Sequence, residues 1–239
     1  TYDLAGQLVL APEFDLETLP QTCAALPQYE ISEAAHFAFV RQTAGVVPLN
    51  DYCGEMADEL DAYGIAGLKF ERRMSYDLAC NWKVYVENYL EPYHLPLVHP
   101  ALHRVTDYDR YAIDCRGWHV RQQGPPRDAK APTAGWYWLF PNTIVNCSFG
   151  LVSTNMVLPV DAGHCRVIAD FYVRESADSA VTDEAIAFSD AIQVEDVAIC
   201  EAVQQGLASG AYAYGVLHPT REIGLMHFAM LYRRMMGQG

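Results

Sequence analysis

Two histidines in one short segment could bind a metal ion. His94 and His99 stand near the end of the stretch 81–100, which begins Asn-Trp-Lys and ends His-Pro. On an ideal helix, residues five apart lie well round the axis from each other, so these two imidazoles would not share a metal. Pro96 stands between them, and a bent or bulged helix would bring both rings to one point. The alternative is an ordinary helix whose polar stripe, with Glu87 and Glu91, faces solvent.

A carboxylate that could complete such a site lies in a long helix expected over 182–207. The apolar stripe of this helix is formed by four residues, Phe188, Ile192, Ile199 and Val203. At about 100° per residue, Asp196 lies roughly 45° from the centre of the stripe and Glu195 slightly farther off on the other side. Asp190 and Glu201 would point nearly opposite. A carboxylate that faces the core is costly unless it is paired or bound to metal, although Asp196 could also be a boundary residue that reaches water or an arginine.

Two neutral imidazoles and one carboxylate form the facial triad that suits non-haem Fe(II), because open coordination positions remain for dioxygen and substrate. Zinc accepts the same three side chains in hydrolases. The ligand types alone therefore leave an iron oxygenase and a zinc hydrolase open.

The remaining sequence predicts the elements that must position these residues. Of the 239 residues, 51% are hydrophobic and 19% are charged, so a packed core is expected. Hairpin character over 1–9 and a proline-bearing linker over 11–27 come first, and a polar loop is expected over 124–133. Strands are predicted over 36–47, 68–76, 118–122, 136–140, 143–149, 151–160 and 165–173, and helices over 49–63, 81–97, 182–207 and 221–236. Strands followed by one long helix predict an α+β fold with an antiparallel sheet around that helix.

The net charge and the spacing of the cysteines disfavour several kinds of partner and binding site. A net charge of -14 and a pI near 4.8 disfavour nucleic acid and anionic membranes as partners. The sequence has no apolar run of transmembrane length and no export signal, so a cytoplasmic protein is expected. The seven cysteines form no Cys-x-x-Cys pair, which predicts reduced thiols and neither structural zinc nor disulfides.

The segment from Asn81 to Pro100 resembles the signature of the Rieske non-haem iron oxygenase large subunit, a pattern of the form N-W-K…E-N…E-x-Y-H…H-P. The run from Glu195 to Glu201, followed by Gln204 and Gly206, is similar to the helix that carries the carboxylate ligand in that family. Together these matches extend over nearly the whole chain.

This resemblance implies a function and a set of roles. His94, His99 and Asp196 would hold one mononuclear Fe(II), Glu91 would bridge to a Rieske [2Fe–2S] cluster of the neighbouring subunit, and Asn88 would lie near the iron. The fold would be the helix-grip sheet. The reaction would hydroxylate or demethylate a small aromatic or methylammonium substrate with O₂, and the electrons would come from NAD(P)H through a reductase or ferredoxin.

One departure from the family concerns the cluster itself. A Rieske cluster needs Cys-x-His and Cys-x-x-His pairs, and this sequence has neither. The resemblance implies that residues 1–20 are the remnant of the cluster domain and its linker, that 21–239 are the catalytic domain, and that the cluster belongs to a missing N-terminal part. An electron path across subunits would imply a homotrimer.

Two alternatives to the oxygenase are a zinc hydrolase with Glu91 as general base and a non-catalytic helix-grip ligand carrier. Tyr85, Tyr89, Tyr212 and Tyr214 are candidates for lining a pocket, including an aromatic cage for a methylammonium group. Five histidines are expected to be surface or core groups and not ligands: His103, His119, His164, His218 and His227. Among these, His227 is the one whose distance from the pocket is of interest.

Overall fold

The computed structural model describes residues 1–42, 47–128, 130, 134–148 and 150–237, and it divides into two units, Thr1–Val47 and Pro48–Gly239. Parts of the predicted strands over 36–47 and 143–149 and of the predicted loop over 124–133 lie outside the described residues, at 43–46, 149, 129 and 131–133.

The first unit contains little regular structure. Tyr2 bridges Leu8 across a turn at Gly6, whose φ of 79° suits glycine, so the predicted hairpin character is confirmed. A short 3₁₀ helix, η1 (Gln21–Cys23), precedes two antiparallel strands, β1 (Glu30–Ala34) and β2 (Phe37–Arg41). The predicted strand over 36–47 begins too early, because Ala35 and His36 both have positive φ and form the turn of this hairpin.

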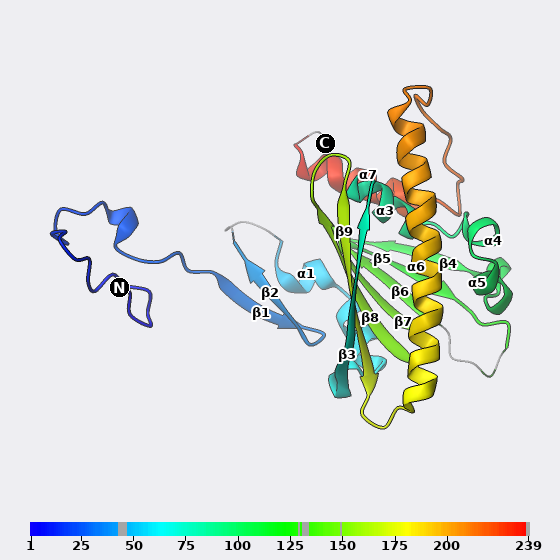
Figure 1. The fold of residues 1–239 in the computed structure, drawn as a ribbon, viewed down its shortest axis with the longest axis horizontal. Helices are drawn as coiled ribbons and strands as arrows, with labels where there is room; N and C mark the ends of the chain where they lie inside the picture. Colours follow the sequence, from blue (N-terminus) through cyan, green and yellow to red (C-terminus); the bar gives the residue numbers. More distant parts are fainter. Residues whose placement is uncertain (43–46, 129, 131–133, 149, 238–239) are drawn as a thin grey trace. The chain divides into compact units, whose positions relative to one another are not determined.

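The second unit is built on one seven-stranded sheet, in which every neighbouring pair is antiparallel (Figure 1). Its order is β3-β9-β8-β7-β6-β5-β4. The strands are β3 (Leu68–Leu78), β4 (Ala112–Arg116), β5 (His119–Gly124), β6 (Ala134–Leu139), β7 (Thr143–Ser148), β8 (Leu151–Pro159) and β9 (Cys165–Arg174). Strand β4, at one edge, was not predicted from the sequence. The α+β prediction is confirmed.

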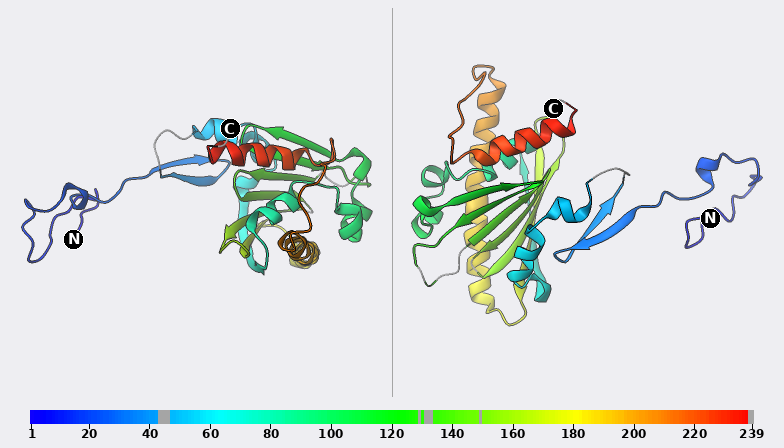
Figure 2. Two further views of the ribbon diagram at one scale, coloured as in Figure 1. Left: turned by 90° about the horizontal axis from the view of Figure 1, so that it is seen from above. Right: turned by 180° about the vertical axis from the view of Figure 1, so that it is seen from behind.

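Helices pack against both faces of this sheet (Figure 2). They are α1 (Leu49–Cys53), α2 (Met56–Ala62), α3 (Trp82–Tyr89), α4 (Leu95–Val98), α5 (Pro100–Val105), α6 (Ser179–Ala208) and α7 (Ile223–Met235), with 3₁₀ turns η2 (Ile65–Gly67) and η3 (Tyr108–Arg110). On one face, Glu59 of α2 forms an ion pair with Arg121 of β5. The single helix predicted over 49–63 is wrong, because Gly54 at φ 51° separates α1 from α2.

The long helix α6 lies across the other face of the sheet, beside α3 (Figure 1). Its N-terminus is capped by Asp178, whose carboxylate accepts hydrogen bonds from two backbone amides. Its buried residues are Thr182, Ile186, Gln193 and Cys200. In the described part of the chain, no helix has the length and apolar character that a membrane crossing requires.

The predicted apolar stripe of α6 is partly wrong. Val203 is 45% exposed. Asp190 accepts a hydrogen bond from the Tyr76 hydroxyl at 2.7 Å, and Glu201 accepts one from the backbone N–H of Ala79 at 2.9 Å. These two acids therefore face the edge strand β3 and its continuation, because the helix contacts that strand as well as the interior.

Helix α7 closes the core beside α3. Phe228 of α7 packs edge-on against Trp82 of α3 and Trp138 of β6, with ring centroids 5.9 and 5.6 Å apart. The two helices approach closely at Gly224, where an added Cβ would stand 2.3 Å from the carbonyl oxygen of Leu90. Leu90 caps the end of α3, so this contact fixes the backbone just before Glu91.

Gly224→Ala is expected to lower the free energy of unfolding by about 1–3 kcal/mol, because one of two backbones must move. Urea denaturation followed by circular dichroism measures it. Gly206→Ala is the matched control: Gly206 lies in α6, and no described atom outside its own helix turn stands within 4 Å of the position that a Cβ would take. Alanine should therefore stabilise the helix there by about 0.5–1 kcal/mol. Equal stability of Gly224→Ala and the unchanged protein would contradict the close packing.

Candidate metal centre

The chain leaves α3 immediately before the candidate ligands. Asn81 caps the start of this helix by accepting a hydrogen bond from the backbone N–H of Lys83. At its end, the carbonyl of Tyr89 accepts a hydrogen bond from the Gln122 side chain of β5 at 2.6 Å. The helix predicted over 81–97, which prolines at 96 and 100 were expected to bend or end, ends earlier than predicted, at Tyr89. Prolines at 92, 96 and 100 explain the break, since proline supplies no amide hydrogen and disfavours helical geometry in the residue before it.

This break places Glu91 against His94. The Glu91 carboxylate accepts a hydrogen bond from the backbone N–H of His94 at 3.0 Å and contacts His94 Nδ1 at 2.5 Å. His94 precedes α4, and His99 stands between α4 and α5 with a non-helical φ of -113° and ψ of 68°. The predicted solvent-facing stripe does not form. The alternative of a bent segment that brings both imidazoles together is the one observed.

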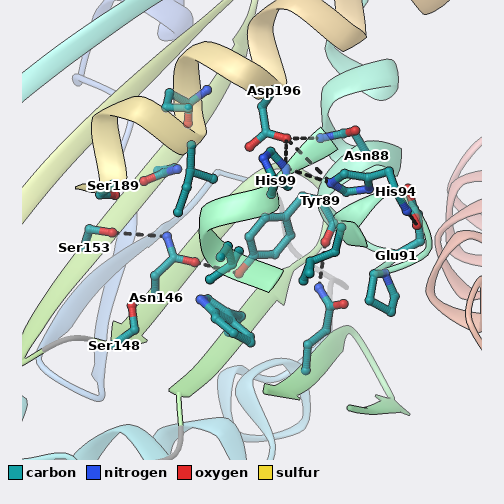
Figure 3. Close-up of a pocket in the computed structure, with 18 of the residues that line it drawn as sticks. Asn88, Tyr89, Glu91, His94, His99, Asn146, Ser148, Ser153, Ser189 and Asp196 are labelled. Atoms are coloured by element: carbon teal, nitrogen blue, oxygen red, sulfur yellow. Dashed lines mark hydrogen bonds and ion pairs between the residues drawn. The ribbon is translucent and has the colours of Figure 1, made fainter. Parts of the chain in front are cut away.

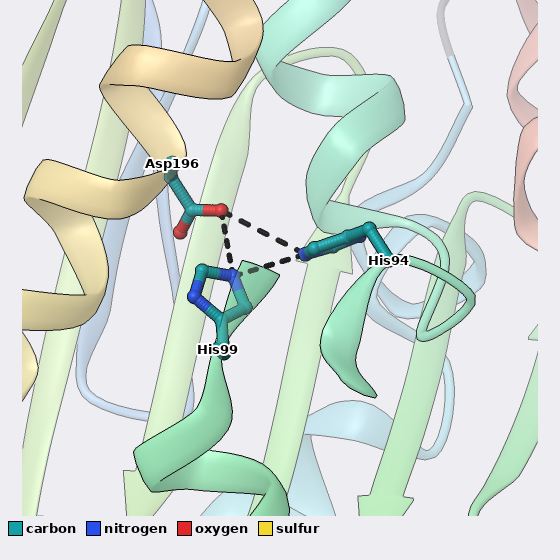
Figure 4. A group of neighbouring side chains, drawn as sticks. All are labelled: His94, His99 and Asp196. Atoms are coloured by element: carbon teal, nitrogen blue, oxygen red, sulfur yellow. Dashed lines mark hydrogen bonds and ion pairs between the residues drawn. The ribbon is translucent and has the colours of Figure 1, made fainter. Parts of the chain in front are cut away.

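Three donor atoms from distant parts of the sequence converge (Figure 4). His94 Nε2 lies 3.0 Å from His99 Nε2, and Asp196 Oδ1 lies 3.1 Å from His99 Nε2 and 3.8 Å from His94 Nε2. Within the described residues, these three form the one group of histidine, cysteine and acidic side chains close enough to hold a metal ion. Ligands about 2 Å from one ion and at right angles are separated by about 3 Å, which suits this spacing.

The hydrogen bonds behind the two rings fix their tautomers. His94 Nδ1 faces Glu91, and His99 Nδ1 faces Glu195 at 2.7 Å, so each Nδ1 carries the proton and donates it. When both rings are neutral, the Nε2 atoms therefore present lone pairs toward each other and toward the Asp196 carboxylate. Three electron-rich atoms at this separation repel unless a cation lies between them, and the residues therefore fit a metal ion.

Neighbouring groups hold these ligands in place. Asn88 donates a hydrogen bond to Asp196 Oδ1 at 2.6 Å, which orients the carboxylate from α3. His99 is 2% exposed. Its burial lowers the pKa of the imidazole, but hydrogen bonds and charge from Asp196 and Glu195 outweigh burial and leave the pKa above its usual value. In the metal-free protein these carboxylates thus favour a positive charge at the site.

The centre opens into a pocket between α3, α6 and the sheet (Figure 3). Its walls include Tyr85, Asn88, Tyr89, Glu91, His94, His99, Tyr111, Gln122, Trp136, Asn146, Ser148, Leu151, Ser153, Asn155, Ser189, Ile192, Gln193 and Asp196. Burial raises the pKa of the Tyr85, Tyr89 and Tyr111 phenols well above their usual range, so they remain neutral.

The sequence predictions about this pocket are partly correct. Tyr85 and Tyr89 line it, whereas Tyr212 and Tyr214 are 58% and 87% exposed and do not. The five histidines expected to lie elsewhere are not among the described residues that line it. His227, in particular, is within 3.1 Å of the Gly117 carbonyl.

Several lining residues were missed from the sequence. Tyr111 and Trp136 stack at 5.7 Å with an interplanar angle of 14°. Ser153 and Asn155 sit two residues apart on β8, on the face that points into the pocket. Polar residues at 153 and 155, on a strand face whose other residues include Leu151 and Val157, are the signal that could have identified the second pair.

Helix α6 and the curved sheet thus form a helix-grip domain in which two histidines and one carboxylate lie close enough together to hold one metal ion. The chain belongs to the family described as "Ring hydroxylating alpha subunit (catalytic domain)", whose model matches residues 65–133 and 115–238. The family predicted from the segment 81–100 is confirmed.

Similar proteins in this family are named as monooxygenases of choline and of carnitine, and one is named putrescine 2-hydroxylase. The chloroplastic choline monooxygenase of Beta vulgaris is 31% identical over 74% of this chain and 42% of its own length. The carnitine monooxygenase oxygenase subunit of Acinetobacter pittii is 27% identical over 89% of this chain and 62% of its own length. The chain spans about half the length of the curated relatives it matches.

A solved structure of a quaternary ammonium Rieske monooxygenase, CntA, in complex with an inhibitor has the same fold. It superposes with a TM-score of 0.83 at 25% identity, and the match covers 98% of this chain and 68% of CntA. The helix-grip prediction is thereby confirmed.

Proposed function

We propose that this chain is the iron-binding catalytic domain of an oxygenase that hydroxylates or demethylates a small methylammonium compound. The observation that carries the proposal is the convergence of two imidazole Nε2 atoms and one carboxylate oxygen, each atom within 3.8 Å of the other two. Fe(II) bound by His94, His99 and Asp196 would supply the dioxygen-activating chemistry, with coordination positions left open toward the pocket.

The surrounding residues have distinct tasks in this proposal. Glu91 and Glu195 hold the protons on His94 Nδ1 and His99 Nδ1, which keeps both Nε2 lone pairs available for the metal. Asn88 positions the Asp196 carboxylate. The buried phenols of Tyr85 and Tyr89 keep water away from one side of the substrate.

Glu91 is also the proposed entry point for electrons. It is partly buried, it lines the pocket, and it contacts a proposed ligand directly. The electrons would come from a Rieske [2Fe–2S] cluster of a neighbouring subunit in a homotrimer, and a reductase or ferredoxin would deliver them from NAD(P)H. Residues 1–20 are assigned to the end of the cluster domain and 21–239 to the catalytic domain.

The substrate class rests on the pocket lining together with the relatives. Tyr85, Tyr89, Tyr111 and Trp136 offer aromatic surfaces that attract a methylated ammonium group. Glu91 and Asp196 add negative charge to the same lining. Choline and carnitine, named in the relatives, both carry a trimethylammonium group.

The hydrolase and carrier alternatives fit less well. A hydrolytic base must be free to take a proton from metal-bound water. Both carboxylate oxygens of Glu91 are already used by His94, one by its backbone N–H and one by its ring. A carrier needs hydrophobic walls but has no use for three converging metal-binding atoms.

The test is turnover by the full-length protein, containing its cluster domain, with NADH, a reductase and trimethylammonium compounds such as choline. We expect oxygen consumption coupled to formation of an aldehyde. Residues 1–239 alone should bind iron but show no turnover. If the full-length protein, loaded with both metal centres, oxidises aromatic compounds and no methylammonium compound, the proposed substrate class is wrong.

A further inference from the structure

Two amide side chains in the pocket each leave one buried atom without a partner. Asn155 on β8 is 8% exposed and Gln193 on α6 is 7% exposed, and both line the pocket. Among the described residues, no protein atom forms a hydrogen bond with Asn155 Oδ1 or with Gln193 Nε2. A buried polar atom without a partner is costly, so a native site that keeps two of them invites a functional explanation.

The rest of each amide is held in place by one phenol. The Tyr85 hydroxyl donates a hydrogen bond to Gln193 Oε1 at 2.7 Å, and hydrogen bonding by the Asn155 side chain acts to lower the pKa of the same phenol. Because the phenol donates to Gln193, it accepts from the Asn155 amide nitrogen. This arrangement fixes which atoms remain: one acceptor, Asn155 Oδ1, and one donor, Gln193 Nε2.

Asn155 and Gln193 line the same pocket as the proposed metal ligands. Gln193 precedes the proposed ligand Asp196 by three residues on α6, so their side chains lie on the same side of the helix, about one turn apart. Polar side chains elsewhere in the pocket behave differently. Asn146 accepts a hydrogen bond from the Tyr89 hydroxyl at 2.9 Å and donates one to Ser153 Oγ at 3.1 Å (Figure 3). Unpaired atoms are therefore not a general property of this lining.

The charges of the lining exclude one kind of partner group. The described residues that line the pocket include two acids of the metal centre, Glu91 and Asp196, and neither lysine nor arginine. All sixteen lysines and arginines of the chain are described residues, so none is left to approach from the remaining positions. A substrate carboxylate would be buried here without a counter-ion.

We infer that Asn155 and Gln193 form a subsite for an uncharged hydroxyl group of the substrate. This inference rests on the proposed function and narrows it to methylammonium alcohols. A hydroxyl donates one hydrogen bond and accepts others, so it matches Asn155 Oδ1 and Gln193 Nε2 together. A carboxylate only accepts and would face the Asn155 oxygen, whereas a second ammonium group only donates and would face the Gln193 NH₂.

The test compares three trimethylammonium compounds by anaerobic calorimetric titration of the Fe(II)-loaded protein. Choline carries a hydroxyl, ethyltrimethylammonium lacks it, and glycine betaine has a carboxylate in its place. We expect choline to bind about 10-fold or more tightly than either of the others, because the analogues leave one or both buried amide atoms unpaired. In Gln193→Leu and in Asn155→Leu, the preference for choline over ethyltrimethylammonium should fall to about twofold or less.

Thr154→Val is the matched control, since Thr154 adjoins Asn155 on β8, points to the opposite face of the sheet and is not among the described residues that line the pocket. It should keep the choline preference of the unchanged protein. Equal binding of choline and ethyltrimethylammonium by the unchanged protein overturns the hydroxyl subsite and leaves the methylammonium proposal standing. Failure of all three compounds to bind overturns the methylammonium proposal itself. The comparison between ligands in the unchanged protein decides the inference even if a leucine variant does not fold.

Discussion

Asp196→Ala is expected to reduce bound iron from one ion per chain to none, and His94→Ala is expected to do the same. Each change removes one of three donor atoms that lie within 3.8 Å of one another. The two protein ligands that remain should bind Fe(II) too weakly to retain it. Divalent iron binds a given set of ligands more weakly than most other first-row metals do. The measurement is metal stoichiometry by mass spectrometry after anaerobic reconstitution with Fe(II).

Glu195→Gln is the control that separates a ligand from its support. Glu195 lies next to Asp196 in sequence, but its carboxylate contacts His99 Nδ1, on the far side of the ring from the metal-binding Nε2. Iron should still bind, with affinity lower by about 10–100-fold, because the ring is less firmly oriented.

Other results would change the assigned carboxylate ligand or the proposed class of protein. Iron that survives Asp196→Ala and is lost in Glu195→Gln would transfer the carboxylate ligand to Glu195. A preference for zinc together with hydrolysis of esters or amides would favour the hydrolase, and the absence of any bound metal would favour the carrier.

The sequence was most informative where local patterns and tertiary structure agree. The alternating runs that became β6, β7, β8 and β9 were predicted within a few residues, because these central strands carry β-branched and aromatic residues that favour a sheet. The helix over 182–207 also appears, as α6, three residues longer at its start because Asp178 supplies the cap. Strand β4 was missed, since a five-residue edge strand gives little periodic signal.

The site was predictable in its residues and not in its geometry. Spacing suggested that His94 and His99 could meet only if the helix bent, and the resemblance supplied the pairing with Asp196. What the sequence could not provide was the second set of contacts, Glu195 to His99 and Asn88 to Asp196, each of which joins residues more than 90 positions apart. Such contacts depend on how α6 lies against α3 and against the segment at α4, which no local pattern encodes.

The predicted apolar stripe on α6 failed for a related reason, because it too depends on which elements surround the helix. An apolar stripe predicts a buried face only when one surface covers the helix. Here α6 contacts α3, α4 and β3, so Asp190 and Glu201 find partners at a place where periodicity puts solvent. The inward position of Asp196 was nonetheless correct, because it depends on its angle from Gln193 and Cys200, which are buried.

Glu91→Gln is expected to lower turnover of the full-length protein by about 10–100-fold while iron stays at one ion per chain. Glutamine keeps an oxygen that can accept the His94 Nδ1 proton, so the ring should retain its orientation. It removes the negative charge that would stabilise His94 when an electron arrives through this contact. Rapid-mixing spectroscopy of the reduced Rieske cluster, in single turnover with substrate and O₂, measures the transfer step directly.

Glu87→Gln is the matched control, because Glu87 lies on the preceding helix, is half-buried and is not among the described residues that line the pocket. Its turnover should stay within about twofold of the unchanged protein. Equal loss of iron and of activity in Glu91→Gln would mean that Glu91 only supports a ligand. Unchanged cluster oxidation in that variant would mean that electrons enter elsewhere. Slow oxidation of the cluster at full iron content would show that Glu91 carries electrons between the cluster and the iron. A residue that only orients His94 has no reason to affect a distant cluster.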